Sequence, residues 1–575
     1  MNYSEEYLRW LNSDVLTTKE KEELVAIETN EELKELHFGS TMSFGTAGLR
    51  STMDLGPACM NTYTVAQATQ GISNLIISER GSQRGVAIAY DSRNNSEAFA
   101  KTAATVLAAN KIKVYLFDGV RPTPELSFAV RELHCIAGIN ITASHNPKQY
   151  NGYKAYWEDG AQISPEQASL VSSYISDIDV LCGFDRVNFE SAVSAGVIEI
   201  LGEDFDEKYL SAVLNTRINE NAVKNVADEL KIVYTPLHGA GYRLVPLVLS
   251  RIGLKYLYTV PEQMVLDGNF PTVKKPNPEY ADVFSLGIDI AEREGSDLII
   301  ATDPDSDRVG VMSRNKEGEF VTVTGNQMGA LLLDYVINAR RENGTLDKNS
   351  YCAKSIVSTE LASRIAQVND VKLYNVLTGF KFIGEVIKKY ESSGAEGEFI
   401  FGFEESYGYL FGSYARDKDA VGATMMICEM TAYYKALGMT ISDALEKLYE
   451  KYGYFGEGVS DYYMEGLDGI EKRRTVMQNL RDNPPATIGG IRVASIGDYS
   501  KGRITDTQTG EIRPTGLTLS DVLYYTLAND DKIIVRPSGT EPKIKMYFLA
   551  SAQSREELDA KTKLYKEDTQ RFVRV

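Results

Sequence analysis

Residues 86–117, VAIAYDSRNNSEAFAKTAATVLAANKIKVYLF, decide the fold class. The stretch opens with VAIAY at 86–90, an apolar and β-rich run, and closes with a second such run, KVYLF, at 113–117. Between them, residues 96–110 have the composition of a helix, with Ser96 as its expected N-cap. A strand, a helix and a strand within about 30 residues predict a βαβ unit.

The same alternation recurs twice further along the chain. It consists of an apolar strand, a helix and a second strand each time, at 230–235, 241–252 and 254–260, and at 353–358, 360–368 and 371–376. Three α/β layers in series are therefore predicted. In such sheets, ligands gather at the carboxyl ends of the strands, where loops lead into helices.

The last section of the chain has a different pattern. Two strands, at 532–535 and 544–549, flank the loop RPSGTEPK and precede a helix with a Ser554/Glu557 capping box. We expect a smaller α+β domain, to which residues 455–490, with few strand signals, form a link. The predicted division of the chain is 1–205, 206–315 and 316–450 for three α/β domains and 451–575 for the α+β domain.

Composition narrows the class of protein. With 575 residues, 43% of them hydrophobic and 25% charged, the chain is typical of a globular protein with several domains. Its net charge of -19 disfavours nucleic acid and anionic membranes as partners, so an anionic substrate would need a local cluster of Lys and Arg. Five scattered cysteines without a CxxC pair, a polar N-terminus and no apolar run of about 20 residues predict a cytoplasmic protein.

The first candidate site loop is ITASHNP at 141–147. Ser144 follows the apolar run IAGIN and precedes Asn146-Pro147, a turn signal that would project the serine hydroxyl from the end of a strand. Taken alone, the pattern also fits a turn serine beside a hydrogen-bonding histidine, His145.

The second loop, DPDSDR at 303–308, follows the apolar strand 297–302. Asp303, Asp305 and Asp307 are spaced two apart and can converge on a hard cation that prefers oxygen ligands. An EF-hand is excluded, because its sixth position would be Arg308 and its twelfth Arg314. A solvated acidic turn is the alternative, but the apolar strand before the loop favours a Mg²⁺ site at which Arg308 can assist.

The third loop is RPSGTEPK at 536–543. It offers hydroxyls, backbone N–H groups around a glycine and a cation at each end, which are the groups that bind phosphate. An ordinary Ser-Gly turn is the alternative. Because such a turn rarely needs Arg, Ser, Thr and Lys together, the sequence favours phosphate binding.

The fourth loop, GFEESYG at 402–408, follows the strand 398–401 and offers carboxylates and hydroxyls that suit sugar hydroxyls. A charged surface loop explains it equally well. Nearby, TGFK at 378–381 opens a helix and could direct the ammonium of Lys381 toward the same cleft.

Other phosphate and nucleophile motifs are excluded at the level of residues. HGAG at 238–241 follows a strand and opens a helix, but the third glycine position of a dinucleotide loop is Leu244. No G-x-x-x-x-G-K-[ST] string occurs, and Ser144 lacks the flanking glycines of a hydrolase elbow. We expect His238 to have a packing or capping role.

In this order, TASHNP, DPDSDR, GFEESYG and RPSGTEPK resemble the α-D-phosphohexomutase family, and FGTAGLR at 44–50 resembles its N-terminal motif. The resemblance covers nearly the whole chain. It implies a four-domain enzyme built around a central cleft, with three similar α/β domains and a fourth domain like the TATA-binding protein.

The resemblance also implies a role for each loop. Ser144 is the expected phosphoserine, and Asp303, Asp305 and Asp307 are expected to hold Mg²⁺ together with the serine phosphate. Lys154, in NGYKAY, is the expected acid-base group; a base there needs a lowered pKa, and a surface lysine is the alternative. The other expected site residues are His145 and Arg50 for catalysis and Thr46, Arg308, Gly379, Lys381, Glu404, Ser406, Arg536, Ser538, Gly539 and Thr540 for the substrate.

The length and the loop variants resemble the branch of the family that interconverts α-D-glucose 1-phosphate and glucose 6-phosphate. This implies an isomerase that needs Mg²⁺ and passes through glucose 1,6-bisphosphate, with a small phosphosugar as its partner and an oligomeric state that the sequence leaves open. Phosphopentomutase, phosphomannomutase and glucose-1,6-bisphosphate synthase activities remain alternatives. A non-catalytic phosphosugar sensor is disfavoured, because Ser144, the three aspartates and Arg536 are all present.

Overall fold

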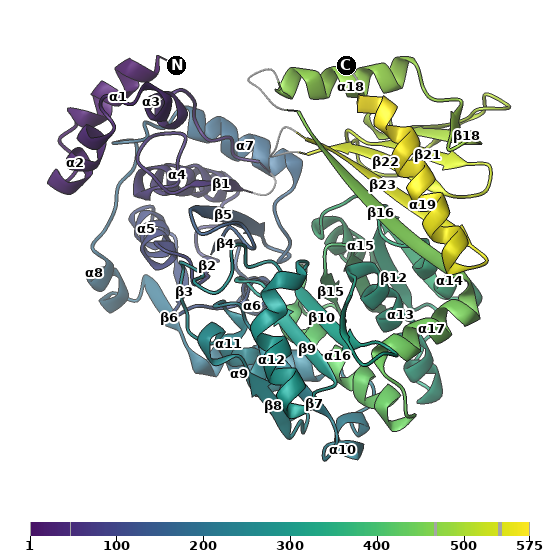
Figure 1. Ribbon diagram of the computed structural model, residues 1–575. Helices are drawn as coiled ribbons and strands as arrows, with labels where there is room; N and C mark the ends of the chain where they lie inside the picture. Colours follow the sequence, from purple (N-terminus) through teal and green to yellow (C-terminus); the bar gives the residue numbers. More distant parts are fainter. Residues whose placement is uncertain (1, 46–47, 465–468, 539–542, 574–575) are drawn as a thin grey trace. The chain divides into compact units, whose positions relative to one another are not determined.

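Four β-sheets follow one another along the chain in the computed structural model, which describes residues 2–45, 48–464, 469–538 and 543–573 (Figure 1). By internal contacts, the chain divides into two compact units. Unit 1 consists of residues 1–323, 387–394 and 407–440, and unit 2 of residues 324–386, 395–406 and 441–575. The four-domain boundaries remain a prediction.

The first sheet confirms the βαβ unit at 86–117. Its strand order is β1-β5-β4-β2-β3-β6, in which β4, β2, β3 and β6 are parallel. Strand β5 pairs antiparallel with β4, and β1 pairs antiparallel with β5. Every residue of β2 is buried, as expected for a central parallel strand with an apolar sequence. The strands are β1 Leu49–Thr52, β2 Val86–Tyr90, β3 Val114–Phe117, β4 Ala137–Ile141, β5 Tyr150–Trp157 and β6 Ile198–Leu201.

The helix of this unit, α5 (Ser96–Ala109), begins where the sequence predicts but is not capped by Ser96. The residue before it, Asn95, has φ +65° and makes no capping hydrogen bond through its side chain. The Ser96 hydroxyl donates instead to Asp91 Oδ1 at 2.8 Å. The predicted cap is wrong because the buried carboxylate at the end of β2 takes this hydroxyl.

The second and third sheets contain the other two predicted repeats. The second has the order β11-β10-β9-β7-β8, with β7 parallel to β8 and β9. In the third, β13, β12 and β14 are parallel neighbours, and β12 ends three residues earlier than predicted because residues 356–358 turn toward the next helix. The strands are β7 Lys231–Thr235, β8 Tyr256–Thr259, β9 Leu298–Thr302, β10 Val309–Arg314, β11 Phe320–Val323, β12 Tyr351–Ser355, β13 Lys372–Val376, β14 Phe399–Glu404 and β15 Gly408–Leu410.

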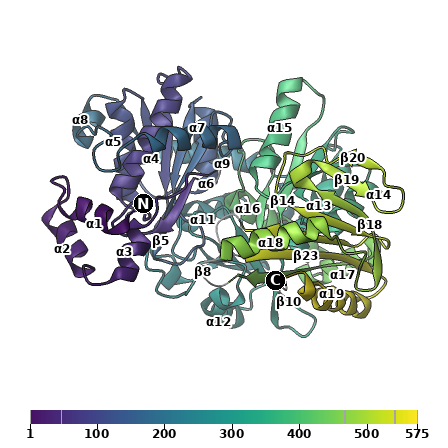
Figure 2. The ribbon, with the colours of Figure 1, turned by 90° about the horizontal axis from the view of Figure 1, so that it is seen from above.

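The fourth sheet is antiparallel and lies in unit 2. Its order is β16-β23-β22-β21-β18-β19-β20, with β17 paired to β18. Helices α18 and α19 both contact β23, which agrees with their places in Figures 1 and 2. The strands are β16 Tyr454–Tyr463, β17 Thr487–Ile488, β18 Ile491–Asp498, β19 Arg503–Asp506, β20 Ile512–Pro514, β21 Leu523–Leu527, β22 Lys532–Pro537 and β23 Lys543–Ala552.

Strand β16 corrects the prediction that 455–490 only links two domains. It pairs with β23 over its whole length, from Tyr454 opposite Ala552 to Tyr463 opposite Lys543. Glycine at 456 and 458 weakens the strand signal in the sequence. The structure explains these glycines, because a Cβ at Gly456 would lie 2.6 Å from a Leu558 methyl carbon on α19. The strand is glycine-rich because helix α19 packs directly on it.

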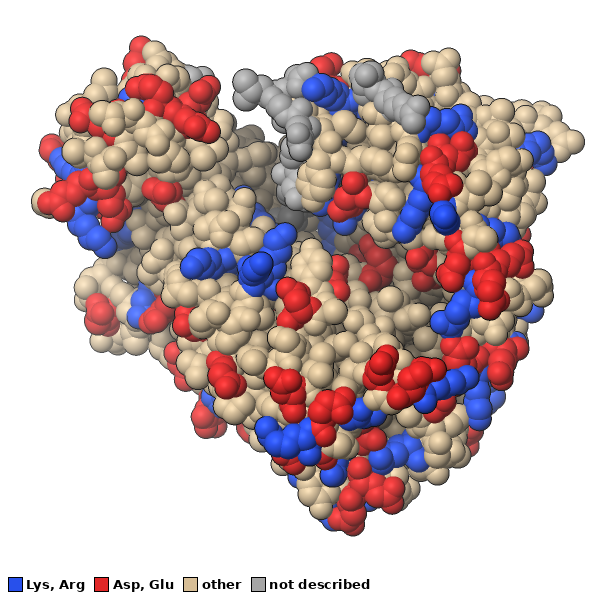
Figure 3. Space-filling view, viewed as in Figure 1, with Lys and Arg blue, Asp and Glu red and all other residues tan. Residues whose placement is uncertain are grey.

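Nineteen α-helices and four 3₁₀ turns lie among the described residues. Ser554 caps the last helix as predicted, with Glu557 N–H donating to the serine hydroxyl, but the reciprocal half of the predicted capping box is wrong, because the Glu557 carboxylate accepts from the N–H of Gln553. Among the helices that the structure describes, we find none with the length and apolarity needed to cross a bilayer. On the face drawn in Figure 3, acidic and basic side chains are interspersed. The helices are α1 Tyr3–Leu11, α2 Thr18–Ala26, α3 Glu31–Phe38, α4 Thr62–Ser78, α5 Ser96–Ala109, α6 Thr123–Glu132, α7 Pro165–Ser176, α8 Phe189–Ser194, α9 Glu203–Leu214, α10 Ala222–Asn225, α11 Gly241–Arg251, α12 Ser285–Glu294, α13 Gly325–Glu342, α14 Glu360–Val368, α15 Lys381–Ser393, α16 Ala420–Ala436, α17 Ile441–Tyr452, α18 Gly469–Asp482 and α19 Arg555–Thr569, and the 3₁₀ turns are η1 Pro261–Gln263, η2 Ala281–Phe284, η3 Tyr499–Lys501 and η4 Gln570–Val573.

Glu457, on β16, gives unit 2 a predicted pH dependence. Burial raises the pKa of Glu457 to about 7 from its ordinary value of 4.5, although a hydrogen bond from Thr359 and the charge of Lys354 oppose the rise. The folded state therefore binds this proton more tightly than the unfolded state. The stability that this provides is fully present below pH 4.5 and is lost as the pH rises to about 7.

Glu457→Gln, which cannot ionise, is expected to unfold with the same free energy as the wild type near pH 4.5. By about pH 7.5 it should be more stable than the wild type by up to about 3 kcal/mol, because only the wild type must then ionise a buried carboxyl. Urea unfolding followed across this pH range measures the difference, with Glu450→Gln at an exposed position of α17 as the control. A difference that does not change with pH would contradict the assignment.

Candidate active site

Ser144 lies in the turn after β4 and is almost completely buried. Its backbone is in the left-handed region, with φ +51°, which costs a residue other than glycine about 1 kcal/mol. In this conformation the Ser144 Oγ donates to Asp303 Oδ2 at 2.7 Å and lies 3.1 Å from Nδ1 of His145. The predicted projection of the hydroxyl from the strand end is thus what the structure shows, and the hydroxyl points at the aspartate loop.

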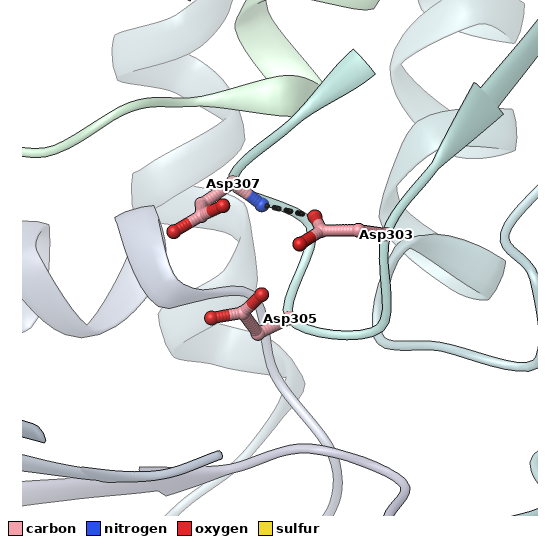
Figure 4. A group of neighbouring side chains, drawn as sticks. All are labelled: Asp303, Asp305 and Asp307. Atoms are coloured by element: carbon pink, nitrogen blue, oxygen red, sulfur yellow. Dashed lines mark hydrogen bonds between the residues drawn. The ribbon is translucent and has the colours of Figure 1, made fainter. Parts of the chain in front are cut away.

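The three aspartates of DPDSDR converge as the sequence predicts (Figure 4). One ligand oxygen from each of Asp303, Asp305 and Asp307 lies within 4.8 Å of the others, and all three residues are buried. The loop is closed by its own backbone, since the N–H groups of Asp307 and Arg308 donate to Asp303 Oδ1 at 3.1 and 3.0 Å. Buried strand β9 brings the loop to this point, and a solvated acidic turn is excluded.

The donor set fits a hard divalent cation. Among the hydrogen bonds of the described residues, none reaches the buried Oδ1 atoms of Asp305 and Asp307. An unpaired buried carboxylate oxygen is costly, and a cation that takes oxygen ligands would satisfy both. The Ser144 Oγ, 2.7 Å from Asp303, is placed to add a fourth oxygen or a phosphate at the same point.

Two lysines neutralise the aspartate cluster. Lys154, on β5, donates to Asp305 Oδ2 at 2.6 Å and to Asp307 Oδ2 at 3.3 Å. Lys418 Nζ lies 3.2 Å from Asp307 Oδ2. Burial lowers the pKa of Lys154, but the two aspartates raise it further, so the net direction is upward and the side chain is an ammonium. Lys154 is therefore buried at the cluster and not on the surface.

The aspartates differ in their electrostatics. Burial and the charges of Asp305 and Asp307 raise the pKa of Asp303 well above its ordinary range. Burial also raises the pKa of Asp307, but Lys418, Lys154 and Arg308 outweigh it and hold the carboxyl ionised. The guanidinium of Arg308 is held by Glu279, which keeps its charge beside the loop.

His145 and Arg50, the other predicted catalytic residues, both lie at the Ser144 turn. Burial and the neighbouring Arg308 and Arg50 charges lower the pKa of His145 well below 6.5, so the imidazole is neutral. Arg50, on β1, donates to the Asn146 side chain at 3.1 Å. The four predicted catalytic residues, on β1, in the turn after β4 and on β5, are thus brought together with the three aspartates in unit 1.

Two polar residues at the cluster were missed from the sequence. Thr123, the first residue of α6, donates its hydroxyl to Asp305 Oδ2 at 2.8 Å and its N–H to the Asp305 carbonyl at 2.8 Å. Lys418 is the other, and the run RDKD at 416–419 was the signal that could have found it. Neither is adjacent in sequence to a residue that it contacts at the cluster.

His238 confirms its predicted structural role. Its two ring nitrogens lie 2.8 Å from the Val265 carbonyl and 2.9 Å from the Thr272 hydroxyl, and the residue is buried. The adjacent glycine lies against the aspartate loop, since a Cβ at Gly239 would be 2.4 Å from the Pro304 Cα. The HGAG loop therefore packs against DPDSDR and supports it.

The predicted sugar-binding loops meet in unit 2. Glu404, the buried last residue of β14, accepts a hydrogen bond from the Gly379 N–H at 2.6 Å. Gly379 has φ +120°, a conformation in which another residue would be strained. Lys381 begins α15 two residues after Gly379. Ser406, within the loop 402–408, is partly buried. The sequence correctly placed 378–381 near 402–408.

The two strands predicted on either side of RPSGTEPK are confirmed as β22 and β23, which pair with each other antiparallel. The Ser538 N–H donates to the Lys543 carbonyl at 2.8 Å, and the Ser538 carbonyl accepts from the guanidinium of Arg473, a cation that was missed from the sequence. Arg536 lies on β22 opposite Lys545. Three predicted substrate residues, Thr46, Gly539 and Thr540, lie outside the described residues.

Comparisons with known proteins agree with this arrangement. Three models of "Phosphoglucomutase/phosphomannomutase, alpha/beta/alpha domain" match the chain: domain I at residues 41–180, domain II at 207–318 and domain III at 324–452. The phosphoglucomutase of Staphylococcus saprophyticus is 36% identical over 529 residues, 92% of this chain and 94% of that protein. The phosphoglucomutase of Staphylococcus epidermidis is 37% identical over 546 residues, 94% of this chain and 96% of that protein.

Among solved structures, parafusin from Paramecium, described as a phosphoglucomutase in its open form, superposes with a TM-score of 0.68. The alignment covers 93% of this chain and 96% of that chain at 17% identity, and so supports the fold. The matches to the domain models and to the bacterial enzymes extend over most of the chain and include every site loop of unit 1. The chain belongs to the phosphoglucomutase/phosphomannomutase family of phosphohexomutases, enzymes that transfer phosphate within a sugar phosphate.

Proposed function

We propose that this chain interconverts α-D-glucose 1-phosphate and glucose 6-phosphate through phospho-Ser144 and glucose 1,6-bisphosphate. The observation that carries the proposal is the buried hydroxyl of Ser144, 2.7 Å from a cluster of three aspartates. A serine oxygen at that distance from a cation site is placed to carry a phosphoryl group. The names of the bacterial relatives support glucose phosphate as the substrate.

The proposed reaction has two phosphoryl transfers. The bond between phosphorus and the Ser144 Oγ breaks while a bond to the free sugar hydroxyl forms, and the resulting bisphosphate reorients and returns its other phosphoryl group to the serine. Asp303, Asp305 and Asp307 would hold Mg²⁺, which would offset the negative charge that develops during transfer. Burial of Ser144 keeps bulk water from competing with the sugar hydroxyl.

Proton transfer is assigned to residues at the cluster. Lys154 is the proposed acid-base group, because it is buried and within 3.3 Å of two metal-site carboxylates. As an ammonium, it would give its proton to the Ser144 oxygen as the bond to phosphorus breaks, and the amine so formed would take the proton of the attacking sugar hydroxyl. His145 and Arg50 are proposed to orient the phosphoserine turn, the histidine through its nitrogen 3.1 Å from Ser144 Oγ. Lys418 and Arg308 add fixed positive charge beside the reacting phosphate.

The residues proposed for the non-reacting end of the substrate lie in unit 2. Glu404 and Ser406 would accept and donate hydrogen bonds to sugar hydroxyls, with Gly379 and Lys381 beside them. Arg536, Ser538, Gly539 and Thr540 would hold the second phosphate, because the sequence RPSGTEPK offers cations, hydroxyls and a glycine, the groups that bind phosphate. The proposal also includes the four predicted domains. It includes a cytoplasmic location as well, since all five cysteines are free thiols.

A coupled assay tests the substrate. Purified protein with Mg²⁺ and a trace of glucose 1,6-bisphosphate is expected to convert glucose 1-phosphate at least about tenfold more efficiently than mannose 1-phosphate or ribose 1-phosphate, judged by kcat/KM. Preference for ribose 1-phosphate would make it a phosphopentomutase. Net accumulation of the bisphosphate from a separate phosphoryl donor, without isomerisation, would make it a synthase.

A further inference from the structure

Arg93 is a buried arginine that the reaction scheme above does not use. It follows β2 in the sequence DSR, and its side chain has no exposed surface. Its Nη1 donates to two backbone carbonyls at 3.0 Å and its Nη2 to two others at 2.5 Å. The four acceptors lie between the proposed phosphoserine and the first residue of β5: Ser144, Asn146, Pro147 and Tyr150.

The other side of this turn is held through Asp91. Arg93 Nε lies 3.3 Å from Asp91 Oδ2, and that same oxygen accepts from the Thr142 hydroxyl at 2.6 Å. The Thr142 hydroxyl in turn accepts from the Ser144 N–H at 2.8 Å. Thr142 therefore binds the N–H of Ser144 and Arg93 binds its carbonyl, while Asp91 links Thr142 to Arg93.

We propose that Arg93 is a positioning residue for phosphoryl transfer, acting with Asp91 and Thr142 to hold Ser144 in its left-handed conformation. Four carbonyls on one side of a turn need a planar set of donors, and a guanidinium provides it. Without Arg93 these four carbonyls, of which that of Ser144 is buried and the others partly buried, lose their donor, and the strained backbone at Ser144 is free to relax.

This inference deepens the proposed function, on which its kinetic part rests. The Ser144 Oγ must stay beside Asp303 and in line with the sugar hydroxyl, and a displacement of about 1 Å can cost on the order of 100-fold in rate. None of the hydrogen bonds that Arg93 donates goes to a residue proposed to bind the substrate, so its loss should lower kcat and leave KM nearly unchanged.

The test compares Arg93→Lys with Arg314→Lys. Lysine keeps the positive charge but not the fork that reaches four carbonyls. Arg314 is a matched control, because it also donates to backbone carbonyls, at Ser296 and Gly318, but on β10 away from the serine turn. We expect Arg93→Lys to reduce kcat and the rate of Ser144 phosphorylation by glucose 1,6-bisphosphate by about 100-fold, with KM within threefold. Arg314→Lys should stay within twofold of the wild type.

Hydrogen exchange gives a readout that does not depend on activity. Amides of residues 143–150 should exchange at least about tenfold faster in Arg93→Lys, while those of β2 and β4 should not change. Thr142→Val should reproduce the faster exchange and the kinetic loss, and Thr142→Ser, which keeps the hydroxyl, should restore both. If Arg93→Lys fails to fold, the two Thr142 variants still test whether Asp91, Arg93 and Thr142 hold the turn.

Three results would overturn the inference: kcat of Arg93→Lys within threefold of the wild type, an equal loss in Arg314→Lys, or equal defects in Thr142→Ser and Thr142→Val. If the wild-type chain shows no mutase turnover, the proposed function fails, and the exchange comparison still decides whether Arg93 and Thr142 hold the turn.

Discussion

Replacing Ser144 with alanine is expected to lower kcat by at least about 10⁴-fold, because a reaction that proceeds through a phosphoserine has no second route once the carrier oxygen is gone. The same change should abolish incorporation of labelled phosphate from glucose 1,6-bisphosphate. Binding of glucose 6-phosphate should persist, since the residues proposed to bind the sugar and its second phosphate are untouched.

The fold should survive this substitution. Alanine fits the backbone at φ +51° no worse than serine, and the lost hydrogen bond to Asp303 should cost only about 1 to 2 kcal/mol of unfolding free energy. Ser313→Ala is the matched control, because it removes another buried serine hydroxyl, on β10, that lacks a hydrogen-bond partner among the described residues. Turnover by Ser144→Ala above a hundredth of the wild-type rate, or continued phosphate labelling, would refute the carrier role.

Local patterns predicted most of the elements of the fold. The strand at 86–90 and the helix at 360–368 have the bounds that the sequence indicates, because apolar runs and cap signals are local properties. The strand β16 was not predicted, because its two glycines, at 456 and 458, weaken the strand signal. These glycines are explained by contacts with α19, which is about 100 residues away in the chain. Ser96 failed as a cap for a similar reason, since its hydroxyl binds a carboxylate outside the helix.

The candidate site also has features that local sequence predicts and features that depend on contacts between distant residues. Asp303, Asp305 and Asp307 were predictable because one loop carries all three, and Ser144 was predictable as their partner only through the family resemblance of its loop. Thr123 and Lys418 were not, because each reaches the cluster from an element more than 100 residues away in the chain. Such contacts depend on how the sheets pack, which spacing along the sequence does not encode.

Ionisation states were the least predictable property. A base at Lys154 needs a lowered pKa, whereas Asp305 and Asp307 outweigh burial and raise the pKa of this lysine. The sign depends on whether burial or the carboxylates dominate, and both follow from tertiary packing. Asp305 and Asp307 are therefore partners of two lysines as well as proposed ligands of a cation.

The second large effect is expected at the aspartate cluster, where Asp305→Asn should weaken metal binding. This change keeps the volume and removes one charge, and it leaves one oxygen where the carboxylate has two. Because Asp305 has a buried Oδ1 that no described residue bonds, we expect this atom to be a metal ligand. Affinity for Mg²⁺ or Mn²⁺ should fall at least about 30-fold, and kcat at saturating Mg²⁺ by about 10³-fold.

Thermal unfolding separates metal binding from catalysis. Mg²⁺ at 100 times its dissociation constant should stabilise the wild type by about 2.7 kcal/mol, and the same concentration should stabilise Asp305→Asn by less than about 1 kcal/mol. Asp297→Asn is the control, because Asp297 precedes the same strand β9 and also binds a lysine, Lys435, at 2.8 Å. It should respond to Mg²⁺ as the wild type does. Equal stabilisation of Asp305→Asn and Asp297→Asn by Mg²⁺ would show that the cation binds elsewhere, and Asp305 and Asp307 would then serve to hold Lys154 and Lys418.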